Sequence, residues 1–166
     1  IGTNSLQGVF GGSNTTASRN TSVGSGSGGG SGGGGITTAK NNVFLGFNSG
    51  GRITSGSSNF FGGNNSGYSV TTGSNNIVIG DSAMYGTVGI AQIGSNNIIL
   101  GSSAGYHAAN ISNSFYVNTI KQSSYADDTS KSLLYGKFNA STSLQSLSIN
   151  AQRVYLPYLT AGVGTK

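Results

Sequence analysis

The stretches Asn76-Ile77-Val78-Ile79-Gly80 and Asn97-Ile98-Ile99-Leu100-Gly101 decide the fold of this chain. Each has a polar residue, then three apolar residues, then Gly. Variants of the same pattern occur in Asn42-Val43-Phe44-Leu45-Gly46, Ser58-Asn59-Phe60-Phe61-Gly62 and Ser114-Phe115-Tyr116-Val117-Asn118. Aligned on their last residue, the five copies recur every 16 to 21 residues. A strand this short cannot bury a face alone and must stack on its neighbours, which predicts an all-β fold: a parallel β-solenoid or β-roll.

The composition agrees with such a fold. The chain has 166 residues, of which 30 are Gly and one is Pro, and only 7% are charged. Gly, Ser, Asn and Thr are interrupted by short β-branched or aromatic clusters, which is typical of many short strands and turns. No segment has the pattern of an amphipathic helix. The absence of Cys excludes disulfides and thiolate metal sites.

The charge pattern limits the partners that we expect. The net charge is +5, but the eight basic residues are scattered along the sequence. Nucleic-acid-binding proteins concentrate basic residues on one face, so we expect a solvated surface and no nucleic-acid partner. No segment is long and apolar enough for a transmembrane helix, so we expect no membrane insertion in this segment.

The spacing of the copies divides the chain into five parts. We expect weak N-terminal rungs in 1–23, a Gly/Ser-rich loop or linker in 24–39, regular β-roll repeats in 40–118, a C-terminal β section in 119–158 and a linker to a downstream segment in 159–166. Within the C-terminal section, 132–138 and 146–150 are predicted to pair as strands, and Asp127-Asp128 to form a turn. A further strand is predicted in 153–156, before Pro157.

Alternation along each strand assigns the apolar residues to two faces. The first and third apolar positions share one face, and we predict that they line the interior of the coil: Val43, Leu45, Phe61, Ile77, Ile79, Ile98, Leu100, Phe115 and Val117. The middle position points the other way: Phe44, Phe60, Val78, Ile99 and Tyr116. Because this column is also apolar and no helix is expected to cover it, we predict that it forms a subunit interface between copies of the chain. The preceding Asn residues, such as Asn42, Asn76 and Asn97, are expected to stack.

The phrases Asn76-Ile77-Val78-Ile79-Gly80-Asp81-Ser82-Ala83 and Asn97-Ile98-Ile99-Leu100-Gly101-Ser102-Ser103-Ala104 resemble the head repeat of YadA-type trimeric adhesins. That family's pattern is Ser-Val-Ala-Ile-Gly-x-x-Ala. The resemblance covers 40–118 well and implies a left-handed parallel β-roll assembled as a homotrimer. This chain differs in its longer, irregular spacing and its bulky middle residue. The longer, Asn-rich version also looks like repeats in tail-fibre and appendage proteins of phages and large viruses.

This resemblance implies an extracellular protein, in a virion tail fibre or appendage used for host attachment. Its partners would be two further copies of itself, other fibre or baseplate proteins, and a glycan or protein receptor on the host surface. The alternative is the head domain of a bacterial trimeric surface adhesin.

The titratable residues do not form a pattern expected of an enzyme. The chain has three acidic residues and one His. Asp127 and Asp128 are adjacent, whereas hydrolysis by paired carboxylates requires two acids that converge across a substrate. The Gly-rich stretch lacks the Gly-Lys-Ser/Thr of a phosphate-binding loop. We therefore predict no catalytic site, no cofactor and no metal; His107 is expected at the surface, with a metal site on a trimer axis as the alternative.

Tyrosines offer a candidate receptor contact. Tyr68, Tyr85 and Tyr106 each follow the Gly corner of successive copies, so they are expected to form a surface ladder. Such a ladder could contact a glycan, or it could hold the corners together or line the trimer interface. An ice-binding solenoid would need a regular Thr ladder, and we expect Thr37, Thr54, Thr71 and Thr72 not to share one position.

Overall fold

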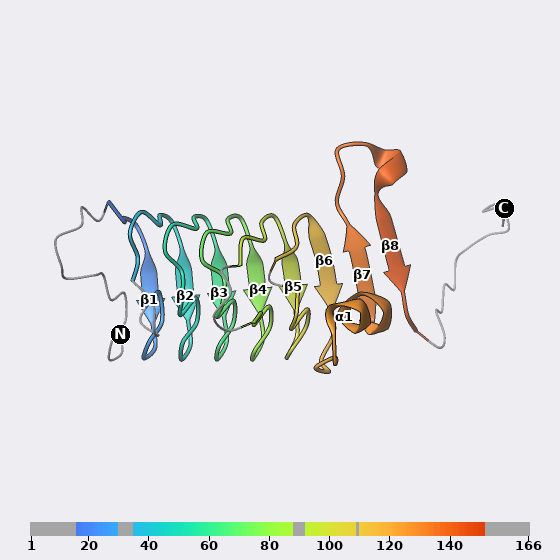
Figure 1. Cartoon of the computed structure of the whole chain (residues 1–166), viewed down its shortest axis with the longest axis horizontal. Helices are drawn as coiled ribbons and strands as arrows, with labels where there is room; N and C mark the ends of the chain where they lie inside the picture. Colours follow the sequence, from blue (N-terminus) through green and yellow to red (C-terminus); the bar gives the residue numbers. More distant parts are fainter. Residues whose placement is uncertain (1–15, 30–34, 88–91, 109, 152–166) are drawn as a thin grey trace, which may run out of the picture.

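The computed structural model describes residues 16–29, 35–87, 92–108 and 110–151. Its core is a row of short strands stacked side by side, with one strand in each coil of the chain (Figure 1). These are β1 (Thr21–Val23), β2 (Val43–Leu45), β3 (Phe60–Gly62), β4 (Ile77–Ile79), β5 (Ile98–Leu100) and β6 (Ser114–Val117). All five pairings among them are parallel, which confirms the predicted parallel β-solenoid.

The sheet continues beyond the solenoid as an antiparallel hairpin. Strand β7 (Leu134–Lys137) pairs with β6, and β8 (Ser146–Ile149) pairs with β7, so the eight strands follow one another in chain order. A short 3-10 helix, η1 (Thr142–Leu144), lies in the loop between β7 and β8. Both predicted C-terminal strands therefore exist, and in Figure 1 the hairpin loop projects beyond the coils.

At β3 the strand pairing aligns the repeat differently from the sequence. Phe44 pairs with Phe61 and Leu45 with Gly62, so it is Gly63 that corresponds to Gly46. With this register, equivalent residues are 17 apart between β2, β3 and β4 and again between β5 and β6. The spacing is 22 between β1 and β2 and 21 between β4 and β5. The extra residues lie in the loops, so the stacking of the strands is unchanged.

The prediction of which residues face the interior of the coil was wrong for most of the residues that it named. The middle residues Phe44, Phe61, Val78, Ile99 and Tyr116 are fully buried inside the coils of their own chain. The residues on either side of each middle residue, such as Ile77 and Ile79 in β4 and Phe115 and Val117 in β6, point outward and are exposed or half-buried. Among the predicted core residues only Phe61 lies inside, and among the predicted interface residues only Phe60 points outward. Alternation separated the two faces correctly, but three consecutive apolar residues do not say which face is inside.

A ladder of buried Asn side chains runs inside the coils beside the middle column. The side-chain amide of Asn59 donates to Oδ1 of Asn42 at 3.0 Å and to the carbonyl of Gly73 at 2.8 Å. Oδ1 of Asn59 in turn accepts from the backbone N–H and the side-chain amide of Asn76, at 3.0 and 2.9 Å. The ladder comprises Asn20, Asn42, Asn59, Asn76 and Asn97 and ends at the backbone N–H of Ser114. The predicted stacking of Asn is confirmed, and the ladder satisfies polar groups that would be costly to bury unpaired.

In the coils of Phe61 and Val78, side-chain volumes are matched between the middle residue and the residue six positions later. Phe61 lies against Gly67, where a Cβ would come within 2.6 Å of the Phe61 ring. Val78 is smaller, and the residue in the position of Gly67 is Met84, which is fully buried and keeps the same left-handed backbone with φ 49°. These two neighbouring coils therefore fill this part of their interiors differently, one with an aromatic residue and Gly and the other with two medium-sized residues.

This volume matching predicts coupling between Val78 and Met84. We expect Met84→Gly to lower the free energy of unfolding by about 2–4 kcal/mol, because it leaves a cavity beside Val78. The double variant Val78→Phe/Met84→Gly reproduces the combination found at Phe61 and Gly67. It should recover about 1–3 kcal/mol of the loss. Urea unfolding of the two single variants and the double variant measures the coupling, and strict additivity would contradict it.

The prediction of a turn at Asp127-Asp128, in a chain without helices, was wrong. Residues Tyr125–Lys131 form a helix, α1, whose N-cap is Ser124. The Ser124 hydroxyl accepts from the backbone N–H of Asp127 at 3.2 Å, and Lys131 forms an ion pair with Asp127 at 2.7 Å. These local interactions stabilise a helix of two turns that has no apolar periodicity.

The Gly/Ser-rich stretch is part of the solenoid at both of its described ends. The backbone N–H groups of Gly28 and Gly29 donate to the carbonyls of Ser49 and Gly50 in the next coil, at 2.9 and 3.0 Å. Ile36 and Ala39 belong to the buried core. The strand predicted in 153–156 and most of the weak N-terminal rungs lie outside the described residues.

Candidate functional site

The outward face of the sheet is a candidate interaction surface. Strand pairing aligns the outward residues of the eight strands in two columns. The first column contains Thr21, Val43, Phe60, Ile77, Ile98, Phe115, Gly136 and Leu147. The second contains Val23, Leu45, Gly62, Ile79, Leu100, Val117, Leu134 and Ile149. None of these residues is charged, and all are apolar except Thr21.

Much of this face is open to solvent in the single chain. Ile77 and Ile79 are each 45% exposed, and Leu147 is 60% exposed. With about 50 Å² for each of the thirteen large apolar side chains, the face exposes on the order of 650 Å² of apolar surface. The largest apolar patch of a typical monomer is about 300–600 Å². A face of this size and regularity is what an interaction surface requires.

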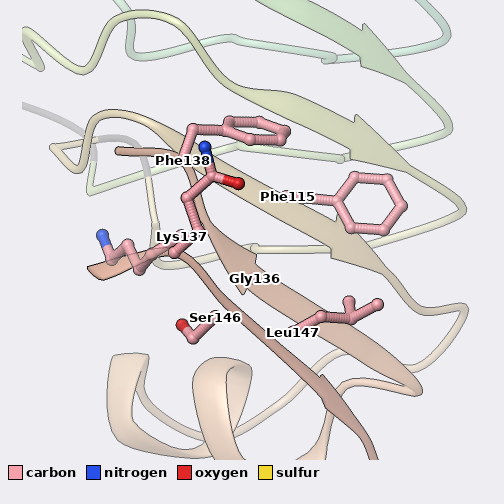
Figure 2. A pocket seen from close by; sticks show the side chains of 7 residues that line it. Phe115, Gly136, Lys137, Phe138, Ser146 and Leu147 are labelled. Atoms are coloured by element: carbon pink, nitrogen blue, oxygen red, sulfur yellow. The ribbon is translucent and has the colours of Figure 1, made fainter. Parts of the chain in front are cut away.

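A shallow groove of about 400 Å³ lies at the hairpin end of this face. Figure 2 shows Phe115 and Leu147 on the same side of the strands, with Gly136 between them and Phe138 at one end. The side chain of Lys137 points away from them, and its ammonium donates to the hydroxyl of Ser114 at 2.7 Å. Because Gly136 has no side chain, the first column has a gap at β7, and this gap is the floor of the groove.

The three tyrosines predicted to form a ladder do so. The rings of Tyr68 and Tyr85 stack at 5.1 Å between centroids with 12° between their planes, and those of Tyr85 and Tyr106 at 5.0 Å with 11°. The ammonium of Lys121 lies 3.8 Å from the Tyr106 centroid. A Cβ at Gly51 would lie 3.0 Å from Cδ2 and Cε2 of Tyr68, so the Gly51 backbone lies close to this ring. The flat faces of Tyr85 contact its two neighbours, and those of Tyr106 contact Tyr85 and Lys121, which favours a role in holding the corners together.

A Thr ladder, which we did not expect, is also present. Thr37, Thr54 and Thr71 occupy the same position in successive coils. Each hydroxyl donates at 3.1 Å to a backbone carbonyl of the next coil, those of Thr54, Thr71 and Gln92 respectively. The prediction was wrong for Thr37, Thr54 and Thr71, because it relied on an alignment without the 17-residue register, whereas Thr72, the residue after Thr71, does not share their position. The hydroxyl hydrogens of Thr37, Thr54 and Thr71 are therefore used in hydrogen bonds between successive coils.

The last coil is covered by α1, which contributes the one fully buried acidic side chain among the described residues. The Asp128 carboxylate accepts from the backbone N–H of His107 at 2.7 Å and lies 3.3 Å from Nδ1 of the same residue. Burial is the main reason why the pKa of Asp128 is raised above its usual range, although the contacts with His107 oppose the shift. His107 is therefore a partner of Asp128 rather than an isolated surface residue.

Asp127 and Asp128 should affect stability in opposite ways as the pH changes. The raised pKa of Asp128 means that its contribution to stability is greatest below pH 3.8 and is lost as the pH rises through the raised pKa. The Asp128→Asn variant retains an acceptor for His107 and should gain stability relative to the native chain between pH 3 and pH 7.

Asp127 provides the matched control for this prediction. Hydrogen bonds from Lys131 and Ser123 lower its pKa to about 2, so its contribution is present above pH 3.8 and is lost as the pH falls toward 2. Asp127→Asn should therefore lose stability relative to the native chain over the same rise in pH. Urea unfolding at pH 3 and pH 7 tests both signs, and parallel pH profiles for the two variants would contradict the assignment.

Neither a metal site nor a membrane helix is found in the described parts of the chain. These residues contain no group of three or more His, Cys, Asp or Glu side chains that could hold a metal ion. None of the helices described has the length and apolar character needed to cross a bilayer. Comparisons with protein-family models, curated proteins and solved structures find no match to this chain.

Proposed function

We propose that this chain is a non-enzymatic segment of a homotrimeric extracellular fibre, a phage or viral tail fibre or appendage used in host attachment. The observation that carries the proposal is the uncharged apolar face that extends over all eight strands and stays partly exposed in the described part of the chain. A solenoid needs its inner face to fold, but it does not need an apolar outer face. Burial against further copies of the same chain accounts for this second apolar face.

The shape of the molecule also supports a structural role. The coils stack along one direction, and the loops project sideways from the stack (Figure 1). Such a rod can extend a fibre and present loops to a host surface, with other fibre or baseplate proteins at its ends. The alternative, the head domain of a bacterial trimeric surface adhesin, rests on the resemblance of two phrases to the YadA-type repeat, Ile-Gly-x-x-Ala from Ile79 and Leu-Gly-x-x-Ala from Leu100.

Sedimentation equilibrium tests the proposed assembly. A trimer has three times the 16.6 kDa mass of the chain, about 50 kDa. We expect this species to persist at micromolar concentration, and a folded monomer would contradict the proposal. Binding of the labelled trimer to glycan arrays and to candidate host cells tests attachment. If the trimer binds none of them, the segment holds the fibre together without contacting the receptor.

A further inference from the structure

We infer that copies of this chain associate in parallel and in register, with the first outward column of one copy packed against the second column of its neighbour at the same strand level. This inference rests on the proposed homo-oligomer and adds which surfaces meet and in which orientation. The first column runs from Thr21 to Leu147 and the second from Val23 to Ile149, as defined above.

The two columns supply apolar surface to both neighbours of a chain in such an association. In a trimer each column faces a different neighbour, so the apolar surface of the two columns, on the order of 650 Å² per chain, is divided between two interfaces. A standard protein–protein interface buries about 800 Å² on each partner, and the polar atoms at its edge contribute to that area. Because neither column carries a charge, two copies can bring these faces together without desolvating an ionised group.

The side chains at individual strand levels favour the parallel register. At β3 the first column has Phe60 and the second has Gly62. At β7 the order is reversed, because the first column has Gly136 and the second has Leu134. The other levels from β2 to β8 have a large apolar side chain in both columns. When first and second columns meet at the same level, each Gly therefore lies opposite a large side chain.

At β7 the groove is the space that the large side chain of the neighbouring copy would fill. Its floor is Gly136, and Phe115 and Leu147 flank it from the adjacent strands. In the parallel register the side chain of the neighbour that reaches this level in the second column is Leu134. A Leu placed above a Gly between two apolar side chains fills the gap, as in the close packing of protein interiors.

An antiparallel association also places each Gly opposite an apolar side chain, with Gly136 opposite Val43, but it brings two aromatic side chains together. Full overlap of the eight strands in opposite directions brings β4 of one copy against β5 of the other and places like columns together. Phe60 at β3 would then lie opposite Phe115 at β6, and Gly62 opposite Val117. Two aromatic side chains would compete for one space in the first column while the second column remained underfilled.

Cysteine cross-linking distinguishes the two registers, because the natural chain contains no Cys. The first experiment co-expresses the single variants Ile77→Cys and Ile79→Cys, which lie at the same level in different columns. The parallel register predicts a disulfide between copies after mild oxidation. The second experiment co-expresses Ile77→Cys with Ile98→Cys, the pair that meets in the antiparallel register. We expect at least about tenfold more cross-linked product in the first mixture than in the second.

The possible results separate this inference from the proposed trimer. Preferential cross-linking of Ile77→Cys with Ile98→Cys would overturn the parallel register. An assembly that sediments normally but gives no cross-link in either mixture would overturn the use of this face. Parallel cross-links in a species of two copies would support the register and contradict the trimer. A folded monomer would overturn both.

A charged substitution tests the same face independently. Ile79→Asp should dissociate most of the assembly into folded monomers, because the new carboxylate would be buried without a partner. The control is Thr72→Asp, which adds the same charge at an exposed position outside the two columns. An Ile79→Asp assembly as stable as the Thr72→Asp assembly would contradict the inference.

Discussion

Replacing Ile99 with Asp should unfold the solenoid, whereas replacing Ile79 with Asp should leave each chain folded. Ile99 is fully buried in the coil interior, while Ile79, one strand earlier, is 45% exposed on the outer face. A carboxylate at Ile99 would be surrounded by apolar side chains with no counter-charge, a change that costs more than about 4 kcal/mol. The same carboxylate at Ile79 reaches water as long as the chain is monomeric.

Far-UV circular dichroism and urea unfolding measure this contrast. We expect the Ile99→Asp chain to lose its β-sheet signal and the Ile79→Asp chain to retain it. Sedimentation of Ile79→Asp then reports assembly separately from folding. If Ile99→Asp folds normally and Ile79→Asp does not, the inner and outer faces of the strands are exchanged relative to this assignment.

Replacing Gly63 with Ala should be strongly destabilising, although the same substitution at the adjacent Gly62 should have little effect. Gly63 has φ 130°, and a Cβ there would lie 2.5 Å from the carbonyl oxygen of Gly80 in the next coil. The backbones of successive coils are in contact at this corner, so the clash cannot be relieved by moving a side chain. We expect a loss of more than about 3 kcal/mol from the combination of strain and displaced backbone.

Gly62 is the matched control for the second prediction. A Cβ at Gly62 would meet the Phe60 ring at 3.2 Å, and this ring lies on the outer face, where it can move. We expect Gly62→Ala to change the free energy of unfolding by less than about 1 kcal/mol. Equal losses for both variants in urea unfolding would show that the coils are not in backbone contact at Gly63.

The C-terminal helix shows one limit of sequence analysis. Helix α1 has no apolar periodicity, and its adjacent acidic residues are typical of a turn. It forms because Ser124 caps its first turn and because Asp128 is held by the backbone N–H of His107. The cap at Ser124 was visible three residues before Asp127, but the contact with His107 depends on the last coil of the solenoid, 21 residues away.

The sequence by itself determined that the chain stacks short parallel strands and that asparagines form a ladder between them. Repetition at near-constant spacing requires this, because each strand is too short to bury a face alone. Only the tertiary structure decided which apolar residues face inward. In a strand such as β4 all three residues are apolar. Alternation therefore places Val78 on one face and Ile77 and Ile79 on the other, but it does not say which face is inside. The coil is narrow: it admits one large side chain per strand beside the Asn ladder, and the other two residues must form the outer face.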